Sequence, residues 1–434
     1  MKIVIIAGGM GTRIASVNSE IPKAMIPISG KPIIEHEVEM AKRQGFTDFL
    51  FVIGYLGEQI EKYFGDGSRW GVHIDYYRET QPLGTAGALG LLRDQLTEDF
   101  FVFYGDTVMD IDMQRMVDYH RAKQADATLF LHPNDHPYDS DLVDIDADGR
   151  VRVFFHKPHP DGLVAHNMVN AALFIFSPRV LTHIEPGTKC HIEKQVLPLC
   201  LEKGMRLYGY VSAEYIKDMG TPERYAAVCA DMESGKVARL NACHKRPAIF
   251  MDRDGVINRE VNLLNREEQM ELIPGAAEAI RLINRSDYLA IVVTNQPVIA
   301  RNLCTLDELD RIHMRMETLL GQEHAYINAL YFCPHHPDAG YPEERKEYKI
   351  KCDCRKPAPG MLLRAAEEWN IDLANSYMIG DSDRDIQAGI NAGVKKAMLI
   401  ATNEEGALLE AVREVMNDGM MDRWNEGLQI VISD

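Results

Sequence analysis

The sequence predicts two doubly wound α/β domains, and three observations indicate that fold class. The chain has 434 residues, more than a single hydrophobic core usually organises. Short β-rich apolar runs, such as Lys2–Ala7 and Ala248–Met251, lead directly into glycines or aspartates. Helical stretches separate these runs, as in parallel sheets built from crossover units. We therefore expect one domain at residues 1–240 and another at 241–434, with a polar connector near residues 230–246.

Composition and charge narrow the classes of function. Hydrophobic residues make up 46% and charged residues 26% of the chain, which is typical of globular proteins. No apolar stretch approaches the ~20 residues of a membrane span, and the apolar run at the start is too short for a signal peptide, so we expect a cytoplasmic protein. The formal charge of −18 disfavours nucleic acids and anionic membranes as partners. Small phosphorylated molecules remain suitable partners, because they need only local cations or a metal.

A glycine-rich loop, Gly8–Arg13, follows the first apolar run. Such a loop lets backbone N–H groups approach phosphate oxygens, and Arg13 adds a positive charge. The spacing fits neither the Walker pattern, which needs Gly-Lys-Ser/Thr, nor the GxGxxG pattern of dinucleotide folds. By itself the loop indicates either a phosphate site or an ordinary turn.

A pair of aspartates, Asp252 and Asp254, follows the apolar run of the second half. Two carboxylates this close repel each other unless a cation lies between them. One of them could instead attack phosphorus while a metal masks the phosphate charge. An ordinary Asp-Gly turn is the alternative for this stretch alone.

Polar residues also end the later apolar runs of the second half. One run ends in Thr294 and Asn295 before Gln296, and another ends before Asp381. Because the carboxyl ends of parallel strands meet at one edge of a sheet, these residues should gather beside the aspartate pair. The basic residues Arg355 and Lys356 could screen a phosphate there.

A cluster of cysteines in the second half predicts a metal site. Cys333 and His335 precede a polar loop, which ends in Cys352 and Cys354. Three thiolates and one imidazole form a standard tetrahedral zinc set, and in a cytosolic protein they indicate metal rather than disulfides. The neighbouring His336 is a competing ligand. Four protein ligands leave no open position, so this zinc would be structural.

The first half, to about residue 230, resembles the sugar-phosphate nucleotidylyltransferases. It carries the GGxGTR motif followed by Pro22-Lys23, and its segment Gln81–Ala88 matches the family segment that contacts the nucleobase and opens a helix. The resemblance implies a Rossmann-like domain, and it implies that the nucleotide is bound by Gly8, Gly9, Gly11, Thr12, Arg13, Lys23, Gln81, Gly84, Thr85 and Asp106.

The same resemblance assigns the remaining transferase residues. It makes Asp106 and Asp218 the ligands of Mg²⁺, and it places Lys157 on the sugar phosphate and Asn170 on the sugar. His156 stands where the family has a glutamate, so any contact of that glutamate is not carried over. Arg13 and Lys23 would neutralise the charge that develops while a sugar 1-phosphate attacks the α-phosphorus of a nucleoside triphosphate.

The sequence does not by itself identify the nucleobase of the substrate. This half looks closest to relatives that make GDP-linked sugars, including heptose and mannose. GTP is therefore the expected substrate, and ATP is the alternative. Related transferases often oligomerise, so the resemblance is compatible with a homo-oligomer. The sequence does not identify an interface.

The second half resembles the haloacid-dehalogenase-type phosphatases. The resemblance makes Asp252 the nucleophile and Asp254 the general acid and base, and it places Mg²⁺ on Asp252, Asp254 and Asp381. Asp385 would orient the site. The phosphate-binding residues it implies are Thr294, Asn295, Arg355 and Lys356.

The zinc loop narrows the resemblance further. Residues 247–403 look like the D-glycero-D-manno-heptose 1,7-bisphosphate phosphatases, although Pro297-Val298 replaces the common Ser-Gly. The histidinol-phosphate phosphatases share this loop and remain an alternative.

Together the two resemblances indicate a bifunctional enzyme of nucleotide-activated heptose synthesis. The phosphatase would leave heptose 1-phosphate, and the transferase would convert it with GTP to GDP-D-glycero-α-D-manno-heptose. One rival is a mannose-1-phosphate guanylyltransferase fused to a phosphatase for another substrate. Another is a chain in which one half is a non-catalytic regulatory module.

Overall fold

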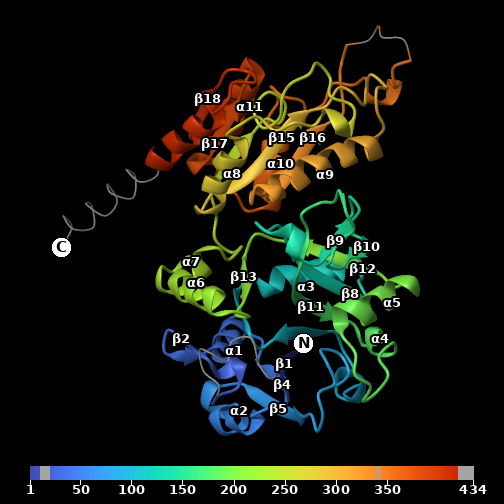
Figure 1. Cartoon of the computed structure of the whole chain (residues 1–434), viewed down its shortest axis with the longest axis vertical. Helices are drawn as coiled ribbons and strands as arrows, with labels where there is room; N and C mark the ends of the chain where they lie inside the picture. Colours follow the sequence, from blue (N-terminus) through green and yellow to red (C-terminus); the bar gives the residue numbers. More distant parts are fainter. Residues whose placement is uncertain (10–19, 339, 341–342, 419–434) are drawn as a thin grey trace, which may run out of the picture. The chain divides into compact units, whose positions relative to one another are not determined.

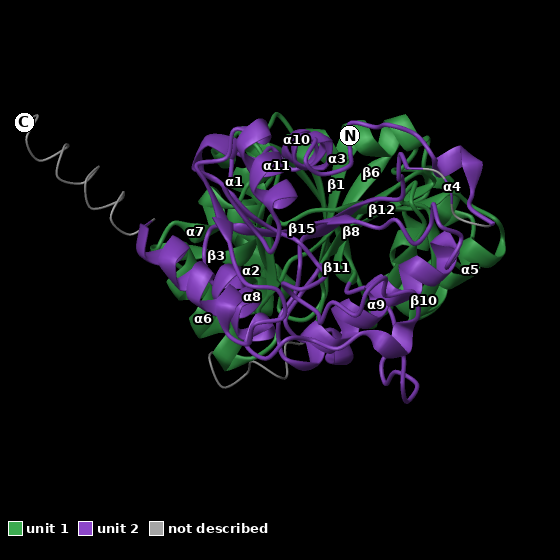
Figure 2. Ribbon diagram, turned by 90° about the horizontal axis from the view of Figure 1, so that it is seen from above, with its two compact units in different colours: residues 1–132, 141–156, 168–244 green, residues 133–140, 157–167, 245–434 purple. Residues whose placement is uncertain are grey.

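The computed structural model describes residues 1–9, 20–338, 340 and 343–418. Its contacts divide the chain into two compact units, which Figure 2 colours separately. Unit 1 comprises residues 1–132, 141–156 and 168–244, and unit 2 comprises residues 133–140, 157–167 and 245–434. Two short segments from the first half of the sequence therefore belong to unit 2.

Unit 1 is built on a nine-stranded mixed sheet (Figure 1). Its main path runs β10-β9-β11-β6-β1-β4-β5, and β8 pairs with both β11 and β12. The pairs β6–β1, β1–β4 and β4–β5 are parallel, whereas β11 is antiparallel to β6 and β8. The strands are β1 (Lys2–Ala7), β4 (Asp48–Ile53), β5 (His73–Arg78), β6 (Phe100–Tyr104), β8 (Ala127–His132), β9 (Leu142–Ile145), β10 (Val151–Phe155), β11 (Val169–Phe176) and β12 (Leu207–Val211).

The apolar runs of unit 1 form central strands because both faces of the sheet are covered. In β1, Ile3 and Ile5 belong to one hydrophobic core and Val4 to another. The core that contains Ile3 also receives side chains from helices α1 (Ile33–Arg43), α2 (Gly57–Phe64) and α3 (Met113–Lys123). Consecutive residues thus point to opposite faces, and both faces are apolar.

A small antiparallel ribbon accompanies this sheet. Strand β7 (Thr107–Asp110) pairs with β13 (Tyr215–Asp218), so that Asp218 lies opposite Thr107. Helices α6 (Pro222–Glu233) and α7 (Lys236–Arg239) follow β13. The ribbon brings the residues after β6 next to the end of β13.

Unit 2 contains a five-stranded parallel sheet in the order β16-β15-β14-β17-β18. The chain moves outward from β14 in one direction and later in the other, so the end of β14 is a topological switch point, where α/β sheets bind ligands. The elements are β14 (Ala248–Met251), α8 (Ala276–Asn284), β15 (Leu289–Asn295), α9 (Leu306–Gln322), β16 (Ala329–Cys333), α10 (Gly360–Glu368), β17 (Tyr377–Gly380), α11 (Asp383–Ala392) and β18 (Lys396–Leu399).

These two units confirm the predicted fold class. The segment 81–88 differs from the expectation, because it forms turns and leads only into a short 3-10 helix, η4 (Leu89–Leu91). Residues 407–418 are helical, and Leu408 and Val412 join the core of unit 2, while the apolar piece at 428–432 lies outside the described residues. Among the described residues, no helix combines the length and the hydropathy of a membrane span.

Candidate active sites

The end of β1 brings the start of the glycine loop against a carboxylate. A Cβ atom on Gly8 would lie 2.5 Å from Oε2 of Glu79, so only glycine lets the two approach this closely. The other oxygen of Glu79 accepts a hydrogen bond from the N–H of Leu83 at 3.3 Å. Burial raises the pKa of Glu79. Gly9 is exposed, and the predicted residues Gly11, Thr12 and Arg13 lie outside the described residues.

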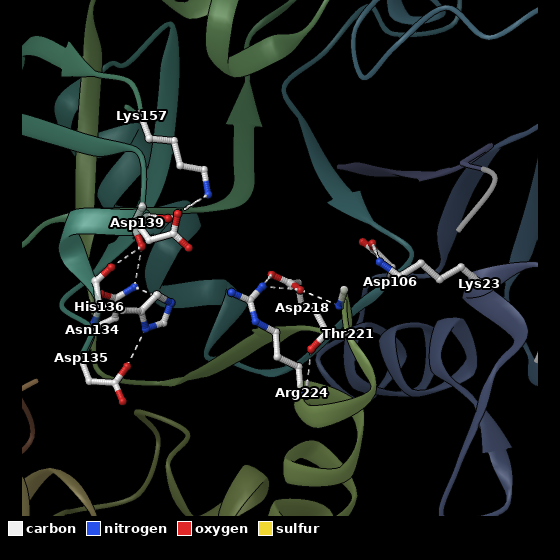
Figure 3. A network of polar contacts seen from close by, with 12 residues as sticks. Lys23, Asp106, Asn134, Asp135, His136, Asp139, Lys157, Asp218, Thr221 and Arg224 are labelled. Carbon is white, nitrogen blue, oxygen red and sulfur yellow. Dashed lines mark hydrogen bonds and ion pairs between the residues drawn. The ribbon is translucent and has the colours of Figure 1, made fainter. Parts of the chain in front are cut away.

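Two ion pairs lie beside the ribbon of unit 1 (Figure 3). Lys23, which begins the 3-10 helix η2 (Lys23–Met25), pairs with the carboxylate of Asp106, just after β6. Arg224 of α6 donates to both oxygens of Asp218, at 2.9 and 2.5 Å. Because Met219 N–H also donates to the carbonyl of Asp106 at 3.0 Å, the two aspartates come from directly adjoining backbone.

The charges around Asp218 keep it ionised. Burial acts to raise the pKa of this carboxyl, but the hydrogen bonds and charge of Arg224, the Gly220 N–H and the charge of Lys23 outweigh it, and the pKa is lowered. Two carboxylates faced by two cations form a set that could bind a divalent cation and a polyphosphate together.

The predicted nucleobase segment is packed against residues 188–193. A Cβ on Gly84 would lie 2.3 Å from the carbonyl oxygen of Cys190, and its φ of +75° also favours glycine. Thr85 accepts a hydrogen bond from the N–H of Ile192 at 2.9 Å. Gln81 is exposed. Gly84 and Thr85 therefore shape the loop, and the side chain of Gln81 is the one open to a ligand.

Asn170 lies at an irregularity in β11. The register of β11 against β8 shifts between Asn170 and Phe174, and Ala172 has a φ of +57°. The side-chain oxygen of Asn170 accepts a hydrogen bond from the N–H of Ala172 at 3.1 Å. Bulges of this kind re-aim side chains and are common next to active sites. Ala172, the residue with the positive φ, is therefore hydrogen-bonded to Asn170, which the resemblance places on the sugar.

Lys157 belongs to unit 2, although its predicted role is in the transferase. Its Nζ donates to the carbonyl of Asp139 at 2.8 Å and lies 3.4 Å from the Asp139 carboxylate (Figure 3). Its neighbour His156 ends a segment of unit 1, where its ring is stacked on Phe154.

The phosphatase candidates gather at the carboxyl ends of the strands of unit 2. Oxygens of Asp252, Asp381 and Asp385 all lie within 4.8 Å of one another. Lys356 is fully buried, and its Nζ lies 2.9 Å from Asp252 Oδ1 and 2.7 Å from Asp385 Oδ1. It also donates to the carbonyl of Val293 at 2.8 Å. The three carboxylates could hold a metal ion, and Lys356 pairs with two of them.

The electrostatics of Asp252 follow from this crowding. Burial raises its pKa; Lys356 opposes the shift, Asp385 and Asp254 add to it, and the result is a pKa of about 6. The excess of negative charge favours a cation in this cluster.

Asp254 points into a different set of contacts. Arg253, which is fully buried, donates to both oxygens of Asp254 at 2.8 Å. Asn258 donates to it at 3.0 Å and Gln296 at 2.8 Å. Burial acts to raise the pKa of Asp254, but Arg253 and these amides lower it overall. Its carboxylate is not among the three that cluster for a metal.

The predicted phosphate-binding residues Thr294, Asn295 and Arg355 already make hydrogen bonds within the protein. Thr294 is buried and accepts a hydrogen bond from Gln296 at 2.9 Å. The side chain of Asn295 clamps the backbone of Lys356, with bonds of 3.1 and 3.0 Å. Arg355 donates to the carbonyl of His335 at 3.0 Å, and burial lowers its pKa. Asn295, at the end of β15, thus fixes the backbone of Lys356, which lies in the turns before α10. The unusual Pro297-Val298 is accommodated because Val298 packs with Cys304 in a small core.

Sequence reasoning gave no role to Arg253, Asn258, Gln296 or Glu79. The signal for Arg253 was its place between the two aspartates, and the signal for Gln296 was its place directly after the Thr294-Asn295 pair. Glu79 carried no signal, because its approach to Gly8 joins the ends of two strands far apart in the sequence.

The cysteine cluster is assembled as predicted. Cys354 Sγ lies 3.2 Å from the sulfurs of Cys333 and Cys352 and 3.4 Å from His335 Nδ1. These four side chains together could hold a metal ion. The competing His336 instead accepts a hydrogen bond from the N–H of Asp338 at 3.2 Å and is outside the group. The cluster joins the end of β16 to the residues directly before Arg355 and Lys356.

Comparisons with known proteins match each half separately. Residues 2–235 match the nucleotidyl transferase family, and residues 353–415 match the HAD-hydrolase-like family. The chain is 33% identical over 234 residues to a mannose-1-phosphate guanylyltransferase of Mycobacterium tuberculosis, which covers 54% of this chain and 64% of that protein. It is 31% identical over 253 residues to the mannose-1-phosphate guanyltransferase beta-B of Xenopus laevis, covering 57% of this chain and 69% of the relative.

The second half has its own relatives. Over 181 residues the chain is 38% identical to the D-glycero-beta-D-manno-heptose-1,7-bisphosphate 7-phosphatase of Vibrio cholerae. The match covers 41% of this chain and 94% of that phosphatase.

Proposed function

The chain belongs to the nucleotidyl transferase family through its first half and to the HAD-like phosphatases through its second, and from this premise we propose that it is a bifunctional enzyme of nucleotide-activated heptose synthesis. The phosphatase activity lies in residues 241–434, and the transferase activity in residues 1–240. The phosphatase removes the C7 phosphate of D-glycero-D-manno-heptose 1,7-bisphosphate, and the transferase joins the resulting 1-phosphate to a nucleotide. The observation that carries the proposal is that each unit has its own carboxylate–cation cluster, one at Asp106 and one at Asp252.

The phosphatase reaction proceeds through an aspartyl-phosphate. A carboxylate oxygen of Asp252 forms a bond to phosphorus while the bond between phosphorus and the C7 oxygen breaks, and Asp254 gives a proton to that oxygen. Asp254 then takes a proton from a water molecule whose oxygen bonds to phosphorus while the bond between phosphorus and the Asp252 oxygen breaks, which releases inorganic phosphate and restores the Asp252 carboxylate. The contacts from Arg253 and Gln296 stabilise ionised Asp254 and so favour this second step.

Lys356 and a magnesium ion share the neutralisation of charge in that site. Lys356 orients Asp252 and offsets part of the phosphate charge, and Asn295 holds the backbone of Lys356 in place. Mg²⁺ would be held by Asp252 and Asp381, with Asp254 as the further expected ligand, and it would offset the remaining phosphate charge. The close set of Asp252, Asp381 and Asp385 fits a divalent cation.

The transferase reaction needs positioning rather than covalent chemistry. An oxygen of the heptose 1-phosphate attacks the α-phosphorus of the nucleoside triphosphate, and pyrophosphate leaves. Lys23 and Arg13 contact the triphosphate, and Lys157 and Asn170 contact the sugar phosphate. Asp106 and Asp218 would hold Mg²⁺, which would neutralise charge on the phosphates.

Glu79 supports GTP as the nucleotide. Its half-buried carboxylate stands beside Gly8, at the start of the nucleotide loop. Guanine offers two adjacent donors, N1–H and the N2 amino group, and one carboxylate can accept both. Adenine has no such pair of donors on that edge. A carboxylate in this position therefore favours GTP over ATP.

Zinc is the metal we assign to the Cys333, His335, Cys352 and Cys354 set. Four protein ligands leave no position for substrate, so this zinc is structural. It holds a loop with little apolar content and fixes the approach to Arg355 and Lys356. Metal analysis of purified protein should find about one zinc per chain in addition to any magnesium.

One further substrate is favoured by a specific observation. Both transferase relatives reported above act on mannose 1-phosphate by name, so a mannose-1-phosphate guanylyltransferase is the second candidate. In that case the phosphatase would act on another sugar phosphate or on histidinol phosphate.

A coupled assay on the purified chain separates the candidates. Each anomer of heptose 1,7-bisphosphate is supplied with Mg²⁺ and one of GTP, ATP, UTP, CTP or dTTP, and phosphate and nucleotide-sugar are followed by mass. We expect phosphate release followed by GDP-heptose, from the α-anomer with GTP. Phosphate release without any nucleotide-sugar would keep the phosphatase assignment and require a new test of the transferase with mannose 1-phosphate. Rapid use of mannose 1-phosphate and GTP, with no phosphate released from either heptose bisphosphate, would establish the second candidate.

A further inference from the structure

Two segments of the first half are held by the phosphatase unit. Residues 133–140 follow β8 and lead to β9, and residues 157–167 follow β10 and lead to β11. Both belong to unit 2 (purple in Figure 2). We call them the first and second loop segments. The strands on either side of each segment belong to unit 1, so both segments leave that unit and return to it.

Helix α9 holds the second loop segment through charged contacts. His166 lies between two acids of the helix, with Nδ1 2.8 Å from Glu317 Oε1 and Nε2 3.1 Å from Asp310 Oδ1. The other oxygen of Glu317 accepts the N–H of Asn167 at 2.9 Å. Glu317 and Asn167 are both buried. Hydrogen bonds to charged groups contribute more than neutral ones, so this is a strong attachment.

The first loop segment is tied to the same helix and to the second segment. Asn134 and Asn167 exchange two hydrogen bonds, of 3.1 and 2.6 Å. Pro137 packs so closely on α9 that a Cβ on Gly321 would lie 2.6 Å from its ring. His324, just past the helix, contacts the carbonyl of Asp135 at 3.0 Å. The two segments and α9 therefore form one packed body.

Lys157 lies at the start of the second loop segment and is held by the first. Its Nζ donates to the carbonyl of Asp139 (Figure 3). The contacts run from Glu317 through Asn167 and Asn134 to the segment that contains Asp139, and so to Lys157. A loop held in this way has already lost much of its conformational entropy before a ligand arrives.

We infer that Glu317 and His166 are positioning residues for nucleotidyl transfer: by anchoring the two loop segments on α9, they set the place of Lys157 for the sugar phosphate. The inference rests on the proposed role of Lys157. Helix α9 thus fixes the loop that carries Lys157, and we expect the affinity for heptose 1-phosphate to depend on these contacts.

The test uses the full chain with Glu317→Ala and, as a matched control, Asp307→Ala, which removes an exposed acid from the same helix. Transferase kinetics are measured with GTP and heptose 1-phosphate, and phosphatase kinetics with heptose 1,7-bisphosphate. We expect the KM for heptose 1-phosphate to rise about tenfold in Glu317→Ala, as for the loss of a charged hydrogen bond. The KM for GTP, the phosphatase kcat/KM and all values of the control should stay unchanged.

Two further variants make the outcome decisive. His166→Ala leaves α9 intact, so it gives the answer if Glu317→Ala does not fold, and its phosphatase kcat/KM reports folding. Glu317→Gln keeps an acceptor for the Asn167 N–H but loses the charge, so it should restore part of the affinity. A purely structural role would instead lower both activities together and would not separate the two KM values.

Lys157→Ala separates this inference from the proposed function. If Lys157→Ala leaves the KM for heptose 1-phosphate unchanged, the assignment of Lys157 is wrong. If that KM rises in Lys157→Ala but stays at the wild-type value in His166→Ala and Glu317→Ala, the anchoring inference is overturned and the function stands. The inference also requires that the double variant Lys157→Ala/Glu317→Ala be no worse than Lys157→Ala alone.

Discussion

The two carboxylate–cation clusters differ in burial and in charge balance. In unit 1, two aspartates face two cations, and the side chains of Lys23 and Asp106 are 12% and 31% exposed. In unit 2, Lys356 pairs with two members of a cluster of three carboxylates, and the side chains of Lys356 and Asp385 are fully buried. A balanced, open cluster suits the binding of a large polyphosphate. A buried cluster with excess negative charge raises the pKa of Asp252 and favours a metal beside the nucleophile.

The largest expected effect is the loss of phosphatase activity in a variant that leaves the transferase cluster unchanged. Asp252→Asn removes the nucleophile, so phosphate release should fall on the order of 10⁴-fold, as for other catalytic nucleophiles. Nucleotidyl transfer, followed separately with heptose 1-phosphate and GTP, should be unchanged. Loss of both activities in a folded variant would contradict the presence of two independent sites.

Stability should distinguish the two lysines. Lys356→Met leaves Asp252 and Asp385 without their buried partner, so the free energy of unfolding should fall by about 3–5 kcal/mol. Lys23→Met removes a partly exposed pair and should cost about 1 kcal/mol or less. Thermal and urea unfolding of both variants measure this difference. Equal losses of unfolding free energy in the two variants would show that burial does not determine how much each lysine contributes to stability.

Nucleotide choice should depend on the first unit alone. Glu79→Gln replaces an acceptor pair by one acceptor and one donor, so the preference for GTP over ATP in kcat/KM should fall about tenfold. Glu98→Gln, an exposed change in the same unit, is the control. If Glu79→Gln keeps the full preference for GTP, the assignment of Glu79 to the binding of the base is wrong. Phosphatase kinetics should be unaffected in either variant.

The smallest expected effect is a pH dependence of the loop anchor. Burial acts to lower the pKa of His166, but the charges and hydrogen bonds of Glu317 and Asp310 raise it well above its ordinary value. The neighbouring His313 stays neutral, because burial lowers its pKa. The stabilisation by protonated His166 is therefore complete below about pH 6.5 and is lost as the pH rises through the raised pKa.

This dependence is measured through the affinity for the sugar phosphate. The KM for heptose 1-phosphate should rise from neutral to alkaline pH in the wild-type chain. In His166→Gln it should start higher, and its additional rise should be absent. Parallel pH profiles of the two proteins would exclude His166 as the source.

The sequence predicted the strands and the residues at their ends, because apolar runs and the turns after them are local features. It placed Asp252 and Asp381 together, since the ends of parallel strands must meet, and it assigned Lys356 to the same site as a residue that could screen a phosphate. It assigned no role to Arg253 and Gln296, although both adjoin predicted site residues, because their contacts with Asp254 become apparent only in the structure. It also gave no sign that His166 would meet Glu317, because that contact joins residues 151 positions apart.

The two loop segments have a consequence for how this protein can be divided. Dividing the chain near residue 240 would separate α9 from the two loop segments. In the whole chain these segments contact α9 at Glu317, through Asn167, and at Gly321, through Pro137. Each fragment would then expose a surface that the whole chain keeps covered. Residues 133–140 and 157–167 lie in the first half of the sequence but belong to unit 2, so replacing the second half by that of a relative requires transplanting these loops as well.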